Sequence, residues 1–264
     1  MEISAIRLVY FSATYTTRKI VRLIAKQMET ETTEYDITQK IPENDILLGA
    51  NELFVIGVPV YAGRISANAL QAITKFKGNN TPAIIVCVYG NRDYDDALLE
   101  LKNTITENGC KVVSAGAFIA QHSIFPTVGT NRPDEEDIIQ IKAFADKTAE
   151  HLQSITDIMA YPEVVVKGNV PYKTPGKIPL TPKASGKCDK CGICAKQCPV
   201  QAIPSDHPRR TDKEICISCG RCIVICPQKA RHFSGLLYKI AGKKFTKANA
   251  ARKEPAYFYA EKRG

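Results

Sequence analysis

Two cysteine motifs with the same spacing dominate the last third of the chain. CDKCGICAKQCP begins at Cys188, and CISCGRCIVICP begins at Cys216, so the pattern C-x2-C-x2-C-x3-C-P is repeated. Together they hold eight of the ten cysteines. A secreted disulfide framework is not expected, because the N-terminal residues MEISAIRLVYF lack the basic flank and cleavage site of a signal peptide. Zinc sites use pairs of CxxC rather than two matched quartets.

The spacing within each motif is that of bacterial iron–sulfur ferredoxins, and residues 187–233 resemble the two-cluster members of that family. Three cysteines on one tight loop can bind three corners of a [4Fe–4S] cubane, and the fourth reaches the other cluster. Gly192 and Gly220 lie inside the loops, where a positive φ is expected. We therefore predict two [4Fe–4S] clusters. The predicted ligands of one are Cys188, Cys191, Cys194 and Cys226, and those of the other are Cys216, Cys219, Cys222 and Cys198.

Charged residues, like cysteines, are distributed unevenly along the chain, and the charge balance changes near residue 160. Residues 1–160 carry 15 basic and 20 acidic side chains, whereas residues 161–264 carry 21 and 7. This asymmetry predicts two domains of different character. We predict a first domain over residues 1–160, a proline-rich linker over 161–186, a cluster-binding domain over 187–235 and a basic, partly helical tail over 236–264.

The first domain alternates strand and helix patterns. Apolar, β-branched runs predict strands over residues 5–11, 33–37, 53–58, 83–89 and 112–119. Helical periodicity predicts helices over residues 17–29, 66–75, 94–108 and 133–155, the last with four acidic residues in its first turn. The predicted fold is a five-stranded, doubly wound parallel α/β sheet of the flavodoxin-like kind, followed by a small α+β domain with two clusters. Ligands of such sheets bind at the carboxyl ends of the strands.

A turn rich in hydroxyl groups connects the first strand to the first helix. Phosphate binds well at a helix N-terminus, where backbone N–H groups and small hydroxyls can donate to it. The alternative is an ordinary helix N-cap, at which serine and threonine are also favoured. The turn resembles the loop by which flavodoxins hold the phosphate of FMN, although Tyr15 stands where they commonly have glycine. The candidate residues are Ser12, Thr14, Tyr15, Thr16 and Thr17.

Two further segments follow the third and fourth strands, GVPVYAGRI and YGNRDYDDAL. Each carries glycine and tyrosine, which suit close backbone approach to a flavin ring and stacking on its face. The alternative is a pair of surface turns with incidental tyrosines. The candidates for contacting the ring are Pro59, Val60, Tyr61, Ala62, Gly63, Gly90, Asn91, Arg92 and Tyr94.

Taken end to end, the chain resembles the flavodoxin–ferredoxin fusion proteins of anaerobic bacteria and archaea, on PVYAGRI, YGNRDYDDALLEL and the cysteine quartets. The resemblance implies a redox protein with FMN and two [4Fe–4S] clusters and no defined substrate. We predict an electron relay that couples one-electron and two-electron steps. The alternatives are a flavin-dependent reductase of a small substrate fed by its own ferredoxin domain, and a non-redox binding protein with a flavin-free first domain.

No residue is assigned a catalytic role, and an electron carrier is favoured over a substrate-specific enzyme. His122 is expected to be structural, and Cys87 and Cys110 receive no role. The basic second half favours a redox partner protein of acidic character. Binding to nucleic acid is not expected, because no DNA- or RNA-binding signature accompanies the charge. The chain has no apolar stretch of membrane-spanning length, and a cytoplasmic location is the expectation.

Overall fold

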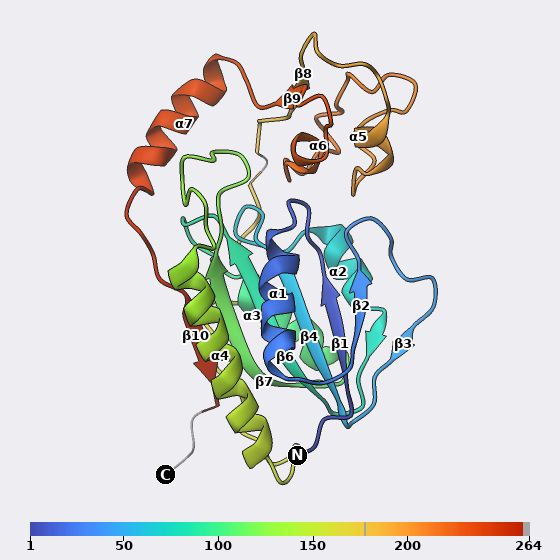
Figure 1. Cartoon of the computed structure of the whole chain (residues 1–264), viewed down its shortest axis with the longest axis vertical. Helices are drawn as coiled ribbons and strands as arrows, with labels where there is room; N and C mark the ends of the chain where they lie inside the picture. The colour runs from blue at the N-terminus through green and yellow to red at the C-terminus, as the bar shows by residue number, and fades with distance from the viewer. Residues whose placement is uncertain (177, 261–264) are drawn as a thin grey trace.

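A six-stranded sheet forms the centre of the first domain in the computed structural model, which describes residues 1–176 and 178–260 (Figure 1). The strand order is β10-β7-β6-β4-β1-β2. Every predicted strand is present within two residues of its expected bounds. The five parallel strands are β1 (Ala5–Tyr10), β2 (Thr32–Asp36), β4 (Glu52–Pro59), β6 (Thr81–Tyr89) and β7 (Cys110–Ile119).

The sheet was predicted to have five parallel strands, and the structure adds a sixth, antiparallel strand. β10 (Ala256–Tyr259) pairs antiparallel with β7, so that the outer edge of β7 is covered. Tyr257 and Tyr259 pack against Phe144 of α4 (Glu135–Ser154), and this aromatic contact holds the strand on the sheet. Covering an exposed edge satisfies its backbone N–H and C=O groups and removes a surface prone to unwanted pairing.

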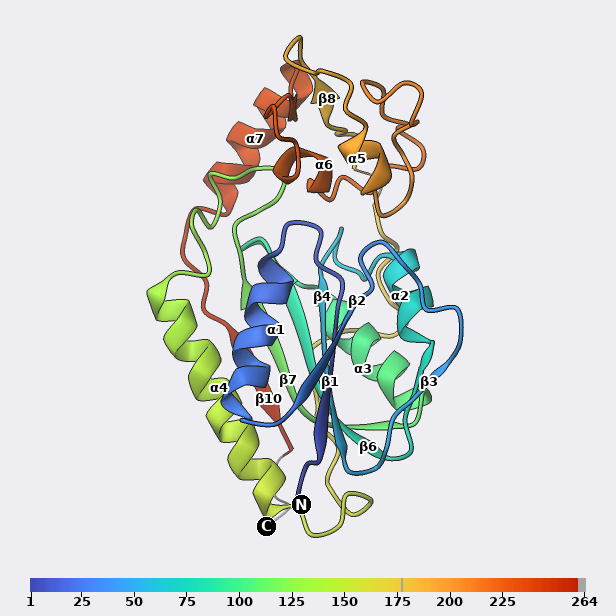
Figure 2. The same ribbon diagram turned by 45° about the vertical axis from the view of Figure 1, so that its right-hand side comes forward.

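Helices cover both faces of the sheet (Figures 1 and 2). α1 (Thr16–Gln27) and α4 pack on one face, where Ile20, Ile24 and Phe144 are buried. α2 (Ala67–Ile73) and α3 (Ala97–Glu107) pack on the other. Asp134 and Asp137 form the capping box that begins α4, in agreement with the acidic first turn expected there. A minor sheet joins β3 (Ile46–Leu47) to β5 (Phe76–Lys77).

The cysteine-rich domain lies over the carboxyl ends of the parallel strands (Figures 1 and 2). It consists of loops, two short helices and one small antiparallel pair. The helices are α5 (Ile193–Lys196) and α6 (Arg221–Val224), and the pair is β8 (Lys183–Ala184) with β9 (Arg231–His232). This domain therefore covers the part of the sheet at which a doubly wound fold binds its ligand.

The first part of the proline-rich segment between the domains, residues 164–173, is bound to the first domain. Val164 and Val166 are buried in the core on the α3 side of the sheet. The carboxylate of Asp96 accepts hydrogen bonds from the backbone N–H groups of Asn169 and Lys173. These contacts restrict the freedom that a connecting segment of this length would otherwise have.

The segment predicted as a basic tail contributes one helix and one strand, and its residues 261–264 lie outside the described part of the chain. α7 (Leu236–Ala248) runs from the cysteine-rich domain back to the first domain (Figure 1). The side-chain amide of Asn91 then donates to the carbonyl oxygens of Asn249 and Ala251, and β10 completes the sheet. The cysteine-rich domain is thus connected to the first domain at both of its ends.

Candidate functional site

One cavity of the cysteine-rich domain brings together four thiols from both motifs. Its cysteines are Cys188, Cys191, Cys194 and Cys226, which are the set predicted for one cluster. Among the described residues, no three His, Cys, Asp or Glu side chains are placed to share a single metal ion. The four cysteines instead surround the cavity, with Pro208 and Arg231 also in its wall.

The other predicted set is close together in space as well. Burial raises the pKa of the Cys219 and Cys222 thiols to about 12, and the neighbouring Cys198 thiol adds to the increase in both. Burial also raises the pKa of Cys216, to which Cys198 is again a neighbour. A thiol that binds a metal is deprotonated by it, so these raised values describe the side chains without iron.

Backbone geometry at the motifs suits metal binding. Gly192 and Gly220 have φ values of 76° and 78°, in the left-handed region that was expected, and each precedes a short helix. Backbone N–H groups donate to sulfur at three of the cysteines. Ala202 donates to Cys198 over 3.3 Å, Ala230 to Cys226 over 3.2 Å and Ser218 to Cys216 over 3.4 Å. Such bonds stabilise negative charge on sulfur and influence the reduction potential of a cluster.

The hydroxyl-rich turn is shaped by its own hydrogen bonds. Ser12 Oγ accepts from the backbone N–H of Arg18 over 3.0 Å, and Thr38 Oγ1 accepts from the backbone N–H of Ser12 over 2.8 Å. Tyr15 precedes α1 with φ 67°, so a tyrosine adopts the left-handed conformation that glycine would take more easily. The Tyr15 side chain makes no cap, but the Ser12 hydroxyl caps the Arg18 N–H in the first turn of α1, so the N-cap interpretation accounts for Ser12. Thr17 is buried in the first turn of the helix.

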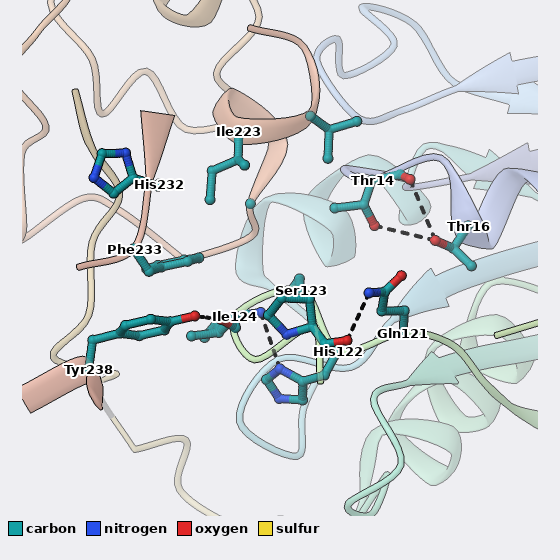
Figure 3. A pocket seen from close by; sticks show the side chains of 13 residues that line it. Thr14, Thr16, Gln121, His122, Ser123, Ile124, Ile223, His232, Phe233 and Tyr238 are labelled. Atoms are coloured by element: carbon teal, nitrogen blue, oxygen red, sulfur yellow. Dashed lines mark hydrogen bonds between the residues drawn. The ribbon is translucent and has the colours of Figure 1, made fainter. Parts of the chain in front are cut away.

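The hydroxyl groups of Thr14 and Thr16 lie 3.5 Å apart and face a cavity of about 360 Å³ between the two domains (Figure 3). Residues 121–124 and Pro126, which follow β7, form another wall of this cavity. The cysteine-rich domain and α7 close it with the following residues: Gly220, Ile223, Val224, His232, Phe233 and Tyr238. The cavity is of the size that small organic ligands occupy.

A side chain of the second cysteine motif reaches the hydroxyl-rich turn, and sequence reasoning missed it. Arg221 Nη1 donates to the carbonyl oxygens of Ser12 and Ala13, over 3.2 and 3.4 Å. Its guanidinium carbon lies 5.1 Å from the centroid of the Tyr15 ring, and that of Arg18 lies 4.7 Å from it. Both distances are within cation–π range. No pattern in the sequence indicates that an arginine between two cysteines would contact this turn.

The loop that follows β4 lies beside the second cysteine motif. Tyr61 and Arg64 exchange backbone hydrogen bonds, and Ala62 and Gly63 between them have positive φ. Tyr61 packs edge-on against Phe11 in the same apolar cluster as Cys219. Burial raises the pKa of Tyr61 well above its ordinary value, and the Cys219 thiol adds to this effect. Pro59 and Val60, at the end of β4, lead into this loop.

The loop that follows β6 makes contacts with neighbouring parts of the chain. Asn91 is 2% exposed, and its amide holds the C-terminal segment. Arg92 pairs with Asp95, and a Cβ at Gly90 would lie 2.5 Å from the His122 ring. Tyr94 is buried against Tyr89, with the Lys167 ammonium 5.0 Å from its ring centroid. The side chains of this loop thus have protein partners, and its contact with a flavin ring stays a prediction.

His122 is held by the loop that follows it. Its Nδ1 accepts from the backbone N–H of Ile124 over 3.1 Å (Figure 3). It also accepts from the backbone N–H of Phe125 over 3.1 Å. The ring also packs against Phe125 and Phe245. Burial, with a smaller effect from the Arg92 charge, lowers the pKa of His122 to about 4. The neutral ring therefore forms one wall of the cavity.

The donors present fit the two kinds of group predicted. Four thiols around one cavity suit an iron–sulfur cluster. At the turn, two hydroxyls, a helix N-terminus and two guanidinium groups suit a phosphate monoester. Arg221 is 4% exposed, and among the described residues its Nε has no hydrogen-bond acceptor and no carboxylate pairs with its guanidinium.

Two family models match the chain. A flavodoxin domain is matched over residues 7–118, and a 4Fe–4S dicluster domain is matched over residues 187–230. Together these domains support binding of FMN and of 4Fe–4S clusters and a role in electron transfer.

Curated relatives match the cysteine-rich part. A segment of 44 residues is 46% identical to a subunit of the ion-translocating oxidoreductase complex of Methanosarcina acetivorans and covers 16% of this chain and 17% of that protein. A segment of 62 residues is 39% identical to a subunit of the tetrathionate reductase of Archaeoglobus fulgidus and covers 23% and 30% of the two chains. The match therefore spans less than a third of either relative.

Among solved structures, a flavodoxin from the domain Archaea aligns with 56% of this chain and 99% of its own, at 13% identity and a TM-score of 0.39. The rubredoxin oxygen:oxidoreductase of Desulfovibrio gigas aligns with 60% of this chain and 38% of its own, at 15% identity and a TM-score of 0.42. Within the described residues, no helix combines the length and apolar character that crossing a bilayer requires.

Proposed function

Because the chain joins a flavodoxin domain to a 4Fe–4S dicluster domain, as flavodoxin–ferredoxin fusion proteins do, we propose that it relays electrons between FMN and two [4Fe–4S] clusters within one polypeptide. The observation that carries the proposal is the contact of the second cysteine motif with the hydroxyl-rich turn through Arg221. Electron transfer needs its two centres close together, and this contact brings a proposed cluster loop onto the proposed flavin site.

Flavin exchanges two electrons and a cluster one, so the bound pair would convert a two-electron donor or acceptor into a one-electron stream. The protein supplies position. The turn at Thr14 and Thr16 would hold the phosphate end of FMN, and the loop at Tyr61 would contact the ring. The proposed ligand sets are those of the sequence analysis, and the shared cavity of Cys188, Cys191, Cys194 and Cys226 supports the crossed arrangement.

A second candidate function is reduction of a small substrate by the flavin. The observation that favours it is the cavity between the domains, whose walls include Gln121, His122 and Tyr238 (Figure 3). His122 Nδ1 accepts two backbone hydrogen bonds and its ring is neutral near pH 7, so it would position a substrate rather than supply a proton from that nitrogen. Tyr238 is also engaged, since its hydroxyl donates to the carbonyl oxygen of Ile124.

Anaerobic purification followed by an absorbance spectrum and metal analysis tests the proposed cofactors. We expect flavin bands together with the broad absorption of iron–sulfur clusters, and about eight irons and eight acid-labile sulfides per chain. A chain with zinc, or with clusters but no affinity for FMN, would contradict the relay.

We further propose that an acidic redox protein docks on α7. Leu236, Leu237 and Ile240 are 73%, 56% and 61% exposed, although they lie on a helix beside the cysteine-rich domain. The helix also carries four exposed lysines, namely Lys239, Lys243, Lys244 and Lys247. An exposed apolar patch with a basic surround suits a partner with an apolar patch bordered by carboxylates.

Charge reversal tests this docking surface. An acidic single-domain flavodoxin serves as the electron acceptor, and the double variant Lys243→Glu, Lys247→Glu is compared with Lys26→Glu, Lys40→Glu on the first domain. We expect the α7 variant alone to slow association and to weaken its dependence on salt. Equal rates for the two variants would contradict the assignment of α7.

A further inference from the structure

Arg221 is a buried cation that pairs with no carboxylate among the residues that the structure describes. It is 4% exposed, and its contacts are the carbonyls of Ser12 and Ala13, the side-chain oxygen of Gln197 and the ring of Tyr15. All of these are neutral. A cluster held by Cys219 and Cys222 would offset part of this buried charge, and an anion bound at the turn would offset more of it.

A second arginine lies on the same tyrosine. The guanidinium groups of Arg18 and Arg221 both contact the Tyr15 ring. Like charges gathered around one small ring repel each other, and the positive end of α1 begins at the next residue. The Thr14 and Thr16 hydroxyls of the same turn lie 3.5 Å apart, and a Cβ at Gly220, next to Arg221, would lie 3.6 Å from Thr14 Cγ2. Hydroxyl donors, a helix N-terminus and two guanidinium groups on one turn favour the binding of an anion there.

The second domain therefore contributes to a site that the flavodoxin domain was expected to build alone. We propose that Arg221 binds the phosphate of FMN, so that the cysteine-rich domain completes the flavin site and FMN binding strengthens the docking of the two domains. This inference rests on the proposed function, because it assumes that FMN binds at the hydroxyl-rich turn. It adds Arg221, from the second cysteine motif, to the residues of the proposed flavin site.

The position of Arg221 also links the binding of FMN to electron transfer. Arg221 lies between Cys219 and Cys222, which are proposed ligands of one cluster. An arginine that holds the phosphate would keep this cluster loop fixed relative to the flavin. Riboflavin, which lacks the phosphate, would bind without this link.

The proposal is tested on the full chain with its clusters, freed of flavin and titrated anaerobically with FMN or riboflavin while flavin fluorescence is followed. In Arg221→Gln we expect FMN affinity to fall about 10-fold to 100-fold, and riboflavin affinity to change less than about twofold. Arg221→Lys keeps the positive charge, so its affinity for FMN should fall less than that of Arg221→Gln. Arg210→Gln is the matched control, because it removes an exposed arginine of the same domain.

A measurement on the unaltered protein keeps the test decisive if the variants lose their clusters. Hydrogen exchange of residues 216–224 should slow when FMN is added and slow less with riboflavin at equal occupancy. The proposal is overturned if Arg221→Gln weakens both flavins equally, or if it changes only the cluster potential. A wild-type chain that binds neither flavin would instead refute the proposed function.

Discussion

Arg221 Nη1 donates a hydrogen bond to the carbonyl oxygen of Ser12 over 3.2 Å, although 209 residues separate the two along the chain. The bond joins the second cysteine motif to the turn that begins α1. It places the two proposed redox sites side by side. Because the cysteine-rich domain is also held by the connecting segment and by α7, its position does not depend on this bond alone.

The crossed pattern of cluster ligands gives the first prediction. Cys226→Ser should destroy the cluster of the first motif, and Cys198→Ser that of the second, because each fourth cysteine belongs to the opposite set. Iron should fall from about eight to about four per chain. Cys110→Ser is the control, since that buried thiol lies in β7 and should leave the iron content unchanged. Loss of the cluster in the same motif as the substituted cysteine would refute the crossing.

The hydroxyl-rich turn gives the second prediction. Thr14→Ala or Thr17→Ala should weaken FMN more than riboflavin, because the lost contacts are to the phosphate. A hydrogen bond to a charged group contributes about 1.5–3 kcal/mol, which is roughly a 10-fold to 100-fold change in affinity. Thr74→Ala, at the end of α2, is the matched control. Equal affinity of the native protein for the two flavins would mean that the turn does not hold phosphate.

Acid sensitivity of His122 gives the third prediction. Its folded-state pKa is lowered from 6.5 to about 4, so the unfolded chain binds the proton more readily. The stability that His122 contributes is therefore complete above about pH 6.5 and is lost as the pH falls toward 4. We expect a loss of about 1 kcal/mol between about pH 7.5 and about pH 5.5 from this residue.

Anaerobic urea unfolding at a series of pH values measures this loss of stability. His122→Asn should show a shallower decrease than the wild type over this range. The exposed His207, replaced in the same way, serves as the control. Identical slopes for the wild type and His122→Asn would contradict the burial of a neutral ring.

The bonds of Asn91 to the C-terminal segment give the fourth prediction. Its side chain donates to two carbonyl oxygens and accepts from the backbone N–H of Lys253. Asn91→Ala removes these three hydrogen bonds, each worth about 0.5–1.5 kcal/mol, and should lower the free energy of unfolding by about 2–4 kcal/mol in total.

Asn80 is the matched control for that variant. It has φ 55° against 59° at Asn91, so replacement by alanine causes the same backbone strain at both positions, but Asn80 is exposed. The melting temperature should therefore fall clearly more in Asn91→Ala than in Asn80→Ala. Equal stability losses would show that the C-terminal segment is held by other contacts.

Local patterns predicted much of this molecule. Apolar runs such as those around Val55 and Ile85 define the central strands, and the buried face of α1 follows its helical periodicity. Both are short-range signals that the chain carries wherever the segment lies. The cysteine spacing likewise indicated which thiols would be neighbours.

Contacts between distant segments could not be predicted in this way. β10 is four residues long, and its partner β7 lies well over a hundred positions earlier, so no local pattern selects that pairing. Arg221 is one basic residue among many in the second half. Its contact with Tyr15 depends on how the two domains dock, which neither segment encodes by itself.

Electron transfer between flavin and clusters, measured as a function of protein concentration, tests the central claim most directly. The flavin is reduced rapidly under anaerobic conditions, and the appearance of reduced clusters is followed by absorbance in a stopped-flow instrument. We predict a rate constant that stays the same over a 100-fold dilution, because both sites lie in one chain whose domains are in contact. A rate that falls in proportion to dilution would contradict the relay and would mean that the two domains serve different molecules.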